Sequence, residues 1–119
     1  VDGVEVSTSQ ENFAPGCDGT LGFAIIFQNN TTHPVPLAVN SSNLRAYGDS
    51  KMELRVNSQL GVPTAECYSS FTLPSLNAGE SRTLAARISN HLGGLSYVDI
   101  VFEGATRLAG LRWRLQLPR

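Results

Sequence analysis

The chain has 119 residues, of which 41% are hydrophobic and only 16% are charged, and its formal net charge is −1. This length suits one domain with one core, and the near balance of nine basic and ten acidic residues argues against a surface built for nucleic acid. No apolar run approaches the roughly 20 residues that a membrane-spanning helix needs, so no direct membrane span is expected.

Strand signals begin early in the chain. Val4 and Val6 indicate a short first strand, and residues 21–28 give the clearest strand of all. Both faces of that strand are apolar near its centre, which predicts a place in the middle of a sheet. Turn-forming residues follow over 29–34, and an alternating strand is expected over 35–39. Prolines at its start lack amide donors, so this strand is predicted to form a sheet edge.

The middle of the chain predicts a hairpin and a further strand. Residues 44–47 and the alternating Met52, Leu54 and Val56 flank a turn at 48–50, which is typical of a hairpin. A short strand is expected over 67–73. Pro74 is expected to end it, because proline has no amide to donate to the ladder.

The last third of the chain predicts three more strands. After a turn at 77–80, apolar residues alternate over 84–88, 98–102 and 111–117. Turn clusters separate the expected strands by about 8–12 residues, which is typical of a sandwich or barrel.

The sequence therefore predicts an all-β fold, an immunoglobulin-like β-sandwich of about seven or eight antiparallel strands. A sheet with one apolar face must bury it against a second sheet; a closed β-barrel is the alternative. The chain lacks an initiator methionine, so residues 1–119 are expected to be a single β-sandwich domain excised from a longer chain. The expected core comprises Phe23, Ile25, Leu54, Leu84, Ile88, Ile100, Trp113 and Leu115.

Three features resemble the Ig-like domains of bacterial envelope lipoproteins and secreted proteins. An early strand runs through a polar turn and a proline into the next strand (FQNNTTHPV, 27–35), a turn precedes a later strand (LNAGES, 76–81), and the final strand carries Trp113. The resemblance covers most of the chain. It implies a sandwich fold in an extracytoplasmic protein, whether secreted, periplasmic or at the cell surface. It implies no activity, because such domains serve as sensors, adhesins, spacers and binding modules.

The two cysteines also bear on the compartment. Cys17 and Cys67 form no C-x-x-C pair, which argues against a zinc or thioredoxin-type site. An even cysteine count in a polar, lysine-poor chain favours an oxidising compartment, so a Cys17–Cys67 disulfide is expected. Two buried free thiols in a reduced protein are the alternative.

Catalytic and metal motifs are missing from the sequence. It contains no H-x-H, H-E-x-x-H or G-x-S-x-G pattern. Ser96, His91 and Asp99 could be drawn as a catalytic set, but no local pattern supports them. We therefore expect no enzyme activity, no metal and no cofactor.

Aromatic rings and loop histidines supply the candidate binding residues. Among the rings of a sugar-stacking platform (Tyr47, Tyr68, Tyr97 and Trp113), Tyr97 is the better exposed candidate, because Trp113 shares its strand face with leucines. His33 and His91 lie in predicted loops, and Leu37 lies on the predicted edge strand.

Two further groups of residues, the late arginines and the N-x-S/T sequons, indicate no specific function. Arg112 and Arg114 share one strand face, which is expected to be solvated, with a patch for nucleic acid or an anionic glycan as the alternative. Asn29, Asn30 and Asn40 begin N-x-S/T sequons, and they are interpreted as turn residues.

The function expected from the sequence is a non-catalytic extracytoplasmic module for protein interaction or structural spacing. Its partner is expected to be another protein or an envelope component. A carbohydrate or small-ligand binding module is the alternative. Binding is expected at an edge strand or at the end loops, so changing His33 or charging Leu37 should impair binding without unfolding the domain.

Overall fold

A computed structural model describes residues 2–9, 21–49, 52–60, 70–88 and 95–117. Within these ranges the chain forms ten β-strands and one short 3-10 helix, with no α-helix. The expectation of an all-β fold is therefore confirmed for the described residues.

The strands follow one another along the chain with these bounds: β1 Val4–Ser9, β2 Leu21–Asn29, β3 Val35–Asn40, β4 Leu44–Gly48, β5 Glu53–Leu54, β6 Val56–Leu60, β7 Thr72–Leu76, β8 Ser81–Ile88, β9 Tyr97–Phe102 and β10 Arg112–Gln116. The 3-10 helix η1 spans Ser41–Asn43 and joins β3 to β4.

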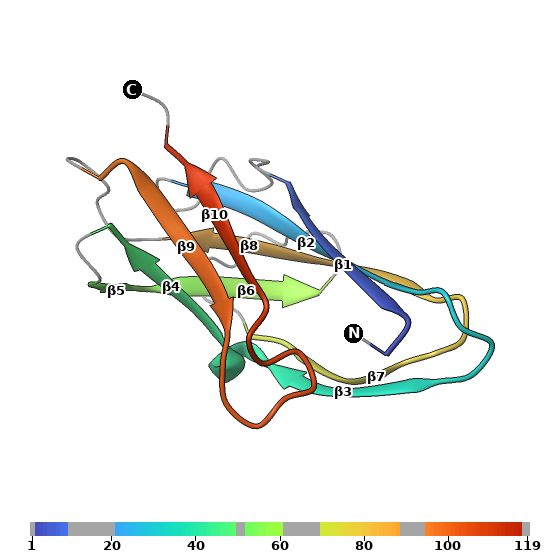
Figure 1. Cartoon of the computed structure of the whole chain (residues 1–119). Helices are drawn as coiled ribbons and strands as arrows, with labels where there is room; N and C mark the ends of the chain where they lie inside the picture. The colour runs from blue at the N-terminus through green and yellow to red at the C-terminus, as the bar shows by residue number, and fades with distance from the viewer. Residues whose placement is uncertain (1, 10–20, 50–51, 61–69, 89–94, 118–119) are drawn as a thin grey trace.

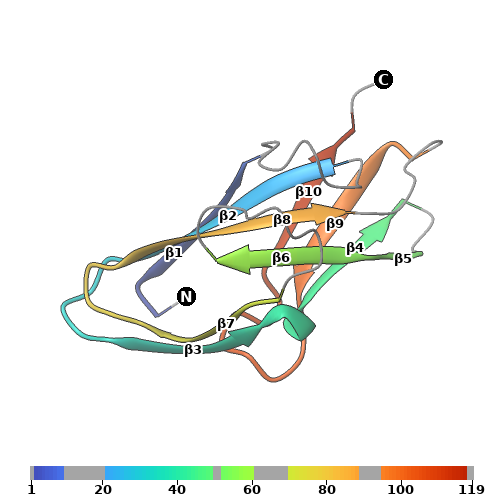
Figure 2. The same ribbon diagram turned by 180° about the vertical axis from the view of Figure 1, so that it is seen from behind.

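The strands build two four-stranded sheets and one two-stranded ribbon. The sheets have the orders β1-β2-β8-β6 and β10-β9-β4-β5, and the ribbon pairs β3 with β7. Every pairing is antiparallel. Figures 1 and 2 show β9 and β10 on one side of β2 and β8, with the ribbon below the larger sheets in both views. The sheets are layered like a sandwich and do not close into the barrel that was the alternative.

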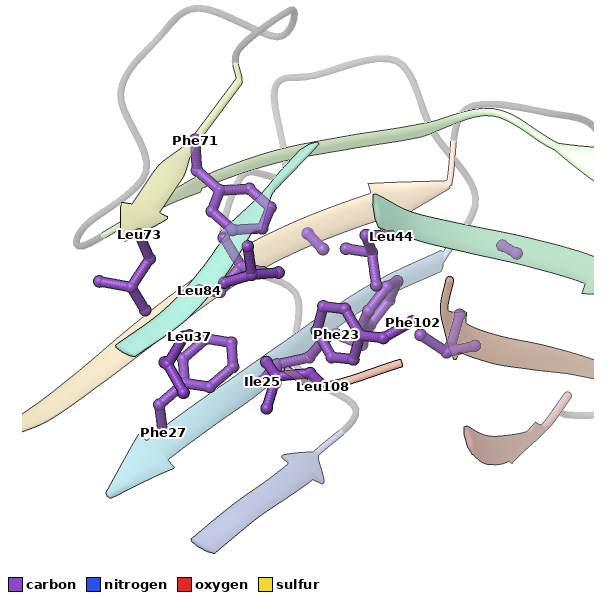
Figure 3. Packing of buried hydrophobic residues seen from close by; sticks show 14 of the residues in the cluster. Phe23, Ile25, Phe27, Leu37, Leu44, Phe71, Leu73, Leu84, Phe102 and Leu108 are labelled. Atoms are coloured by element: carbon purple, nitrogen blue, oxygen red, sulfur yellow. The ribbon is translucent and has the colours of Figure 1, made fainter. Parts of the chain in front are cut away.

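The hydrophobic core lies between the sheets. On β2, Phe23, Ile25 and Phe27 alternate inward and are each fully buried, as the period of two in the sequence predicts. Figure 3 shows these side chains packed near Phe102 of β9 and Leu108 of the loop that follows it.

Most of the core prediction is confirmed. Seven of the eight residues are buried: Phe23, Ile25, Leu54, Leu84, Ile88, Ile100 and Leu115. Trp113 has the expected inward phase, but it is only half-buried because its strand lies at a sheet edge. Its ring still packs edge-on against Phe102, with ring centroids 5.9 Å apart.

The prediction of one strand through Met52, Leu54 and Val56 is wrong. Leu54 belongs to β5, which pairs with β4, whereas Val56 begins β6, which pairs with β8 in the other sheet. Both residues face the same core from opposite layers, so the apolar alternation continues while the chain changes sheets. The predicted hairpin between β4 and β5 is confirmed, with Ala46 opposite Leu54.

The sequence predicts that Pro74 ends its strand, and this prediction is wrong. Pro74 lies within β7, between Leu73, which pairs with Val39, and Ser75, which pairs with Pro36. The ladder shifts register between Pro36 and Val39. Proline is tolerated at such an irregularity, because the missing amide interrupts no regular ladder bond there.

Asn29 fixes the corner at which β2 and β8 pass into the ribbon. Its side chain is fully buried, and its Nδ2 donates to the carbonyl oxygens of His33 (2.9 Å), Leu76 (3.0 Å) and Asn77 (3.0 Å). Its Oδ1 accepts the Thr31 amide at 2.9 Å. One amide group therefore ties together the two turns at this end of the sandwich. Asn29 was interpreted as a turn residue, but it is the last residue of β2, and its side chain holds the turn that follows.

Replacing Asn29 by Asp should destabilise the fold strongly. The change keeps the shape but removes the donor that three carbonyl oxygens share, one of them in the buried Leu76, and it brings a carboxylate close to them. We expect a loss of about 2–4 kcal/mol in the free energy of unfolding, measured by urea denaturation. Asn40→Asp is the matched control, because the exposed side chain of Asn40 acts through its oxygen, which accepts hydrogen bonds from Ser42 at the start of η1. Equal losses in the two variants would contradict this role of Asn29.

Candidate functional site

The structure separates the residues that the sequence singled out. His33 is exposed at the turn between β2 and β3, whereas Tyr97 is half-buried at the start of β9. Leu37 is fully buried in β3. These three residues therefore do not form one site, and His91 lies outside the described residues, as do both cysteines.

Leu37 corrects the expectation of an open edge on β3. Its side chain is 0% exposed, and its carbonyl oxygen accepts the amide of Arg107 at 3.0 Å and the hydroxyl of Thr106 at 2.9 Å. The loop after β9 thus occupies the edge of β3 at this point. A charge at Leu37 would enter the core, so it would unfold the domain rather than probe a binding surface.

The most organised polar surface lies on the β10-β9-β4-β5 sheet. We call the outward positions of this sheet, together with the adjoining Glu103, the outer face. Alternate strand residues share one face of a sheet, and the register sets their order. The outer face comprises Arg45, Tyr47, Glu53, Tyr97, Asp99, Val101, Glu103, Arg112, Arg114 and Gln116. One row across all four strands is therefore Arg114, Asp99, Tyr47 and Glu53.

Arg114 joins β10 to β9 on the outer face. Its Nε and Nη2 donate to Oδ1 and Oδ2 of Asp99, at 2.9 and 3.2 Å, which is a two-pronged contact. Its guanidinium carbon also lies 3.7 Å from the centre of the Tyr97 ring. The hydrogen bond from Arg114 lowers the pKa of Asp99 below its ordinary value.

Tyr47 covers the middle of the outer face. Its hydroxyl lies 3.2 and 3.1 Å from the carboxylate oxygens of Glu103. Val101 points outward between Arg45 and Arg112 in the register, and it is only 6% exposed. Burial, and then the hydrogen bond to Glu103, raise the pKa of Tyr47.

The β4–β5 hairpin adds a further ion pair to the outer face. Arg45 Nη1 donates to Glu53 Oε1 at 2.6 Å, and this hydrogen bond raises the pKa of Arg45. An open depression of about 540 Å³ adjoins the pair and is lined by Ser41, Ser42, Leu44, Arg45, Glu53, Leu54, Arg55 and Val56.

Arg112 differs from the other two arginines of the outer face. Arg45 and Arg114 both have carboxylate partners, whereas Arg112 forms no ion pair with a described residue. Its charge acts on Asp99, whose pKa it helps to lower. Within the described part of the chain, Arg112 therefore brings a positive charge without an ion-pair partner to a surface whose other arginines are paired.

A second depression lies at the opposite end of the ribbon. It has a volume of about 340 Å³ and is lined by Asp2, His33, Pro34, Val35, Pro36 and Arg107. Arg107 and Asp2 form an exposed ion pair at 3.4 Å across it. His33 thus stands in the wall of a shallow, open site.

Among the described residues, no group of three or more His, Cys, Asp or Glu side chains is placed to hold a metal ion. The same residues include no helix with the length and apolarity that crossing a membrane requires. No family model, curated protein or solved structure matched the chain.

Sequence reasoning found part of the outer face and missed the rest. It placed Tyr97 and Asp99 on one outward face, and it paired Arg112 with Arg114, all of which the structure bears out. It did not connect these residues with Arg45 or Glu53. The predicted hairpin contained the information that was needed, because its register places Arg45 and Glu53 on the same face of the sheet.

The stability that Asp99 contributes should depend on pH. Its pKa is lowered in the folded state, so the carboxylate stabilises the fold above the unfolded pKa of about 4. That contribution should be lost as the pH falls through the lower, folded pKa. We expect Asp99→Asn to reduce stability slightly at pH 7 and to converge with the wild type in strong acid, measured by denaturant unfolding. Asp2→Asn is the control, and a constant difference across this range would contradict the account.

Proposed function

We propose that this chain is a non-catalytic, extracytoplasmic Ig-like module that binds another protein through the outer face. The observation that carries the proposal is the lateral bonding of aromatic, cationic and anionic side chains across all four strands of one sheet. Arg114 with Asp99, Tyr47 with Glu103, and Arg45 with Glu53 form that network.

The composition of the outer face supports a protein partner. Tyrosine and arginine are enriched at protein interfaces and dominate their binding energy. The lateral bonds also hold these long side chains in place before binding, which lowers the entropy that association costs. The contact of Arg114 with Tyr97 illustrates this, because it fixes an arginine and a ring together.

The ring positions favour a protein over a carbohydrate, which is the alternative ligand. A sugar-stacking platform needs an open aromatic face. Arg114 lies over the ring of Tyr97, so one face of that ring is already occupied, and the hydroxyl of Tyr47 is bound to Glu103 and not free to bond to a sugar. The two depressions described above, beside Arg45 and beside His33, are also wide and open, unlike the enclosed pockets that bury small ligands.

The strand order supports the Ig-like part of the proposal. An Ig sandwich places strands A, B, E and D in one sheet and strands C, F and G in the other, and variable-type domains add C′ beside C. The order β1-β2-β8-β6 corresponds to A-B-E-D, and β10-β9-β4-β5 corresponds to G-F-C-C′. The β3–β7 ribbon is then an addition, inserted between B and C and between D and E.

A Cys17–Cys67 disulfide would support the extracytoplasmic part. We expect thiol titration of the unfolded, unreduced protein to find no free thiol, because an oxidising compartment would have paired the two cysteines. Titration after reduction is the control and should recover both thiols. Two free thiols in protein purified under non-reducing conditions from its native compartment would argue for a reduced protein and against this localisation.

Variants of the outer face should test the interaction itself. We expect Tyr97→Ser and Arg112→Glu each to weaken capture of a native partner by roughly tenfold or more while leaving the unfolding midpoint nearly unchanged. Gln28→Glu is the matched control, because Gln28 lies on the outward side of the other sheet. The measurement is a quantitative pull-down, run beside a glycan array and a hydrolase panel.

Three results would contradict the proposal. The first is a partner that binds all variants alike, and the second is a glycan that binds in place of a protein. The third is catalytic turnover that disappears when a single Ser, His or Asp is changed.

A further inference from the structure

The strand β10 lies at an edge of its sheet. Among the described strands it pairs only with β9. The Phe102 amide donates to the Leu111 carbonyl, and the Leu117 amide donates to the Ser96 carbonyl, both at 3.0 Å. Hydrogen-bonded pairs alternate with non-bonded pairs along an antiparallel ladder. The main-chain groups of Trp113 therefore face β9.

The amides and carbonyls of Arg112 and Arg114 then face away from β9. Their side chains stand on the outer face, while Trp113 between them points inward and is only half-buried. A strand added to this edge would pair its backbone with these two arginines. Its own side chains opposite them would lie on the outer face, and those in between would lie beside Trp113.

Charge decides which strand fits this edge. Arg114 is already paired with Asp99, whereas Arg112 has no ion pair with a described residue, so the edge has excess positive charge. A second copy of β10 would bring arginines beside arginines, which is unfavourable across paired strands. Acidic side chains on the added strand, opposite Arg112 and Arg114, would instead be attracted by both arginines.

Other edges in the described part of the chain fit a partner strand less well; β7, for example, contains Pro74, which has no amide to donate. The strand β5 has only two residues, and the edge of β3 is occupied at Leu37 by the loop after β9. On the outward side, β6 presents Asn57 and Gln59, and β1 presents Glu5 with serines, so neither edge selects a partner by two aligned charges.

We propose that the β10 edge binds an extended segment of the partner protein, which adds as a strand and carries acidic side chains at alternate positions with apolar side chains between them. This rests on the proposed function and names the chemistry of the partner at the outer face. Main-chain bonds would supply affinity, and the two arginines would set the register.

Amide hydrogen exchange in the intact chain tests the edge directly. In the free protein we expect the amides of Arg112 and Arg114 to exchange much faster than those of Trp113 and Leu115. A synthetic peptide of alternating glutamate and valine should slow exchange at both arginines. Protection of these two amides in the free protein, at the level of Trp113, would overturn the proposal because the edge would already be occupied.

Matched peptides separate strand addition from simple charge attraction. Methylating the peptide amides that face β10 should abolish binding, whereas methylating the alternate amides should leave it intact. A peptide with lysine in place of glutamate should bind roughly tenfold more weakly. Equal binding of all four peptides, no binding of any, or self-association of the free chain through β10 would each overturn the proposal.

Charge reversal gives the complementary test. Arg112→Glu should weaken binding of the glutamate peptide roughly tenfold and improve binding of the lysine peptide, whereas Arg107→Glu, in the part of the loop that bonds to Leu37, should change neither. If Arg112→Glu fails to fold, the exchange pattern of the wild type still decides the question. A native partner that depends on Tyr97 but leaves the β10 amides unprotected would refute strand addition alone. A native partner whose binding neither depends on Tyr97 nor protects the β10 amides would refute the proposed function as well.

Discussion

The rest of the structure depends on the buried amide of Asn29. The paired strands β2 and β8 leave the sandwich side by side, and their continuations β3 and β7 pair again as a ribbon. Two turns must therefore bend together, and three carbonyl groups at this corner, including that of the buried Leu76, accept from shared donors. The Asn29 side chain supplies them by reaching His33, Leu76 and Asn77, and its own main-chain amide donates to Glu80. The corner is thus held by hydrogen bonds rather than by apolar packing alone.

The corner determines which surfaces remain for function. Because the ribbon turns back at this end, Leu37 is buried and the loop after β9 closes over its carbonyl. The β10-β9-β4-β5 sheet differs, because the ribbon does not cover its outward side (Figure 1). There the side chains bond to one another, as Arg114 does with Asp99, and form a prepared polar surface. The outer face and the β10 edge are therefore the parts of this fold best suited to a partner.

The sequence could predict what depends on alternation and could not predict what depends on layers. The period of two placed Ile25 and Ile100 in the core and Tyr97 on the outside, because each side-chain direction follows from strand phase. It could not show that Leu54 and Val56 belong to different sheets, since both keep the same inward phase. It also placed Leu37 at an open edge, because proline marks an edge without telling what covers it. The roles of Cys17 and Cys67 stay predictions.

The most direct test of the central claim is the hydrogen bonding of the Asn29 side chain in solution. NMR should detect couplings across hydrogen bonds from Asn29 Nδ2 to the carbonyl carbons of Leu76 and Asn77, together with slow exchange of the side-chain amide protons. Buried donors that hold two turns together open only when the corner opens, so their exchange should be as slow as that of the core amides. Rapid exchange of these protons, with no coupling to either carbonyl, would contradict the account.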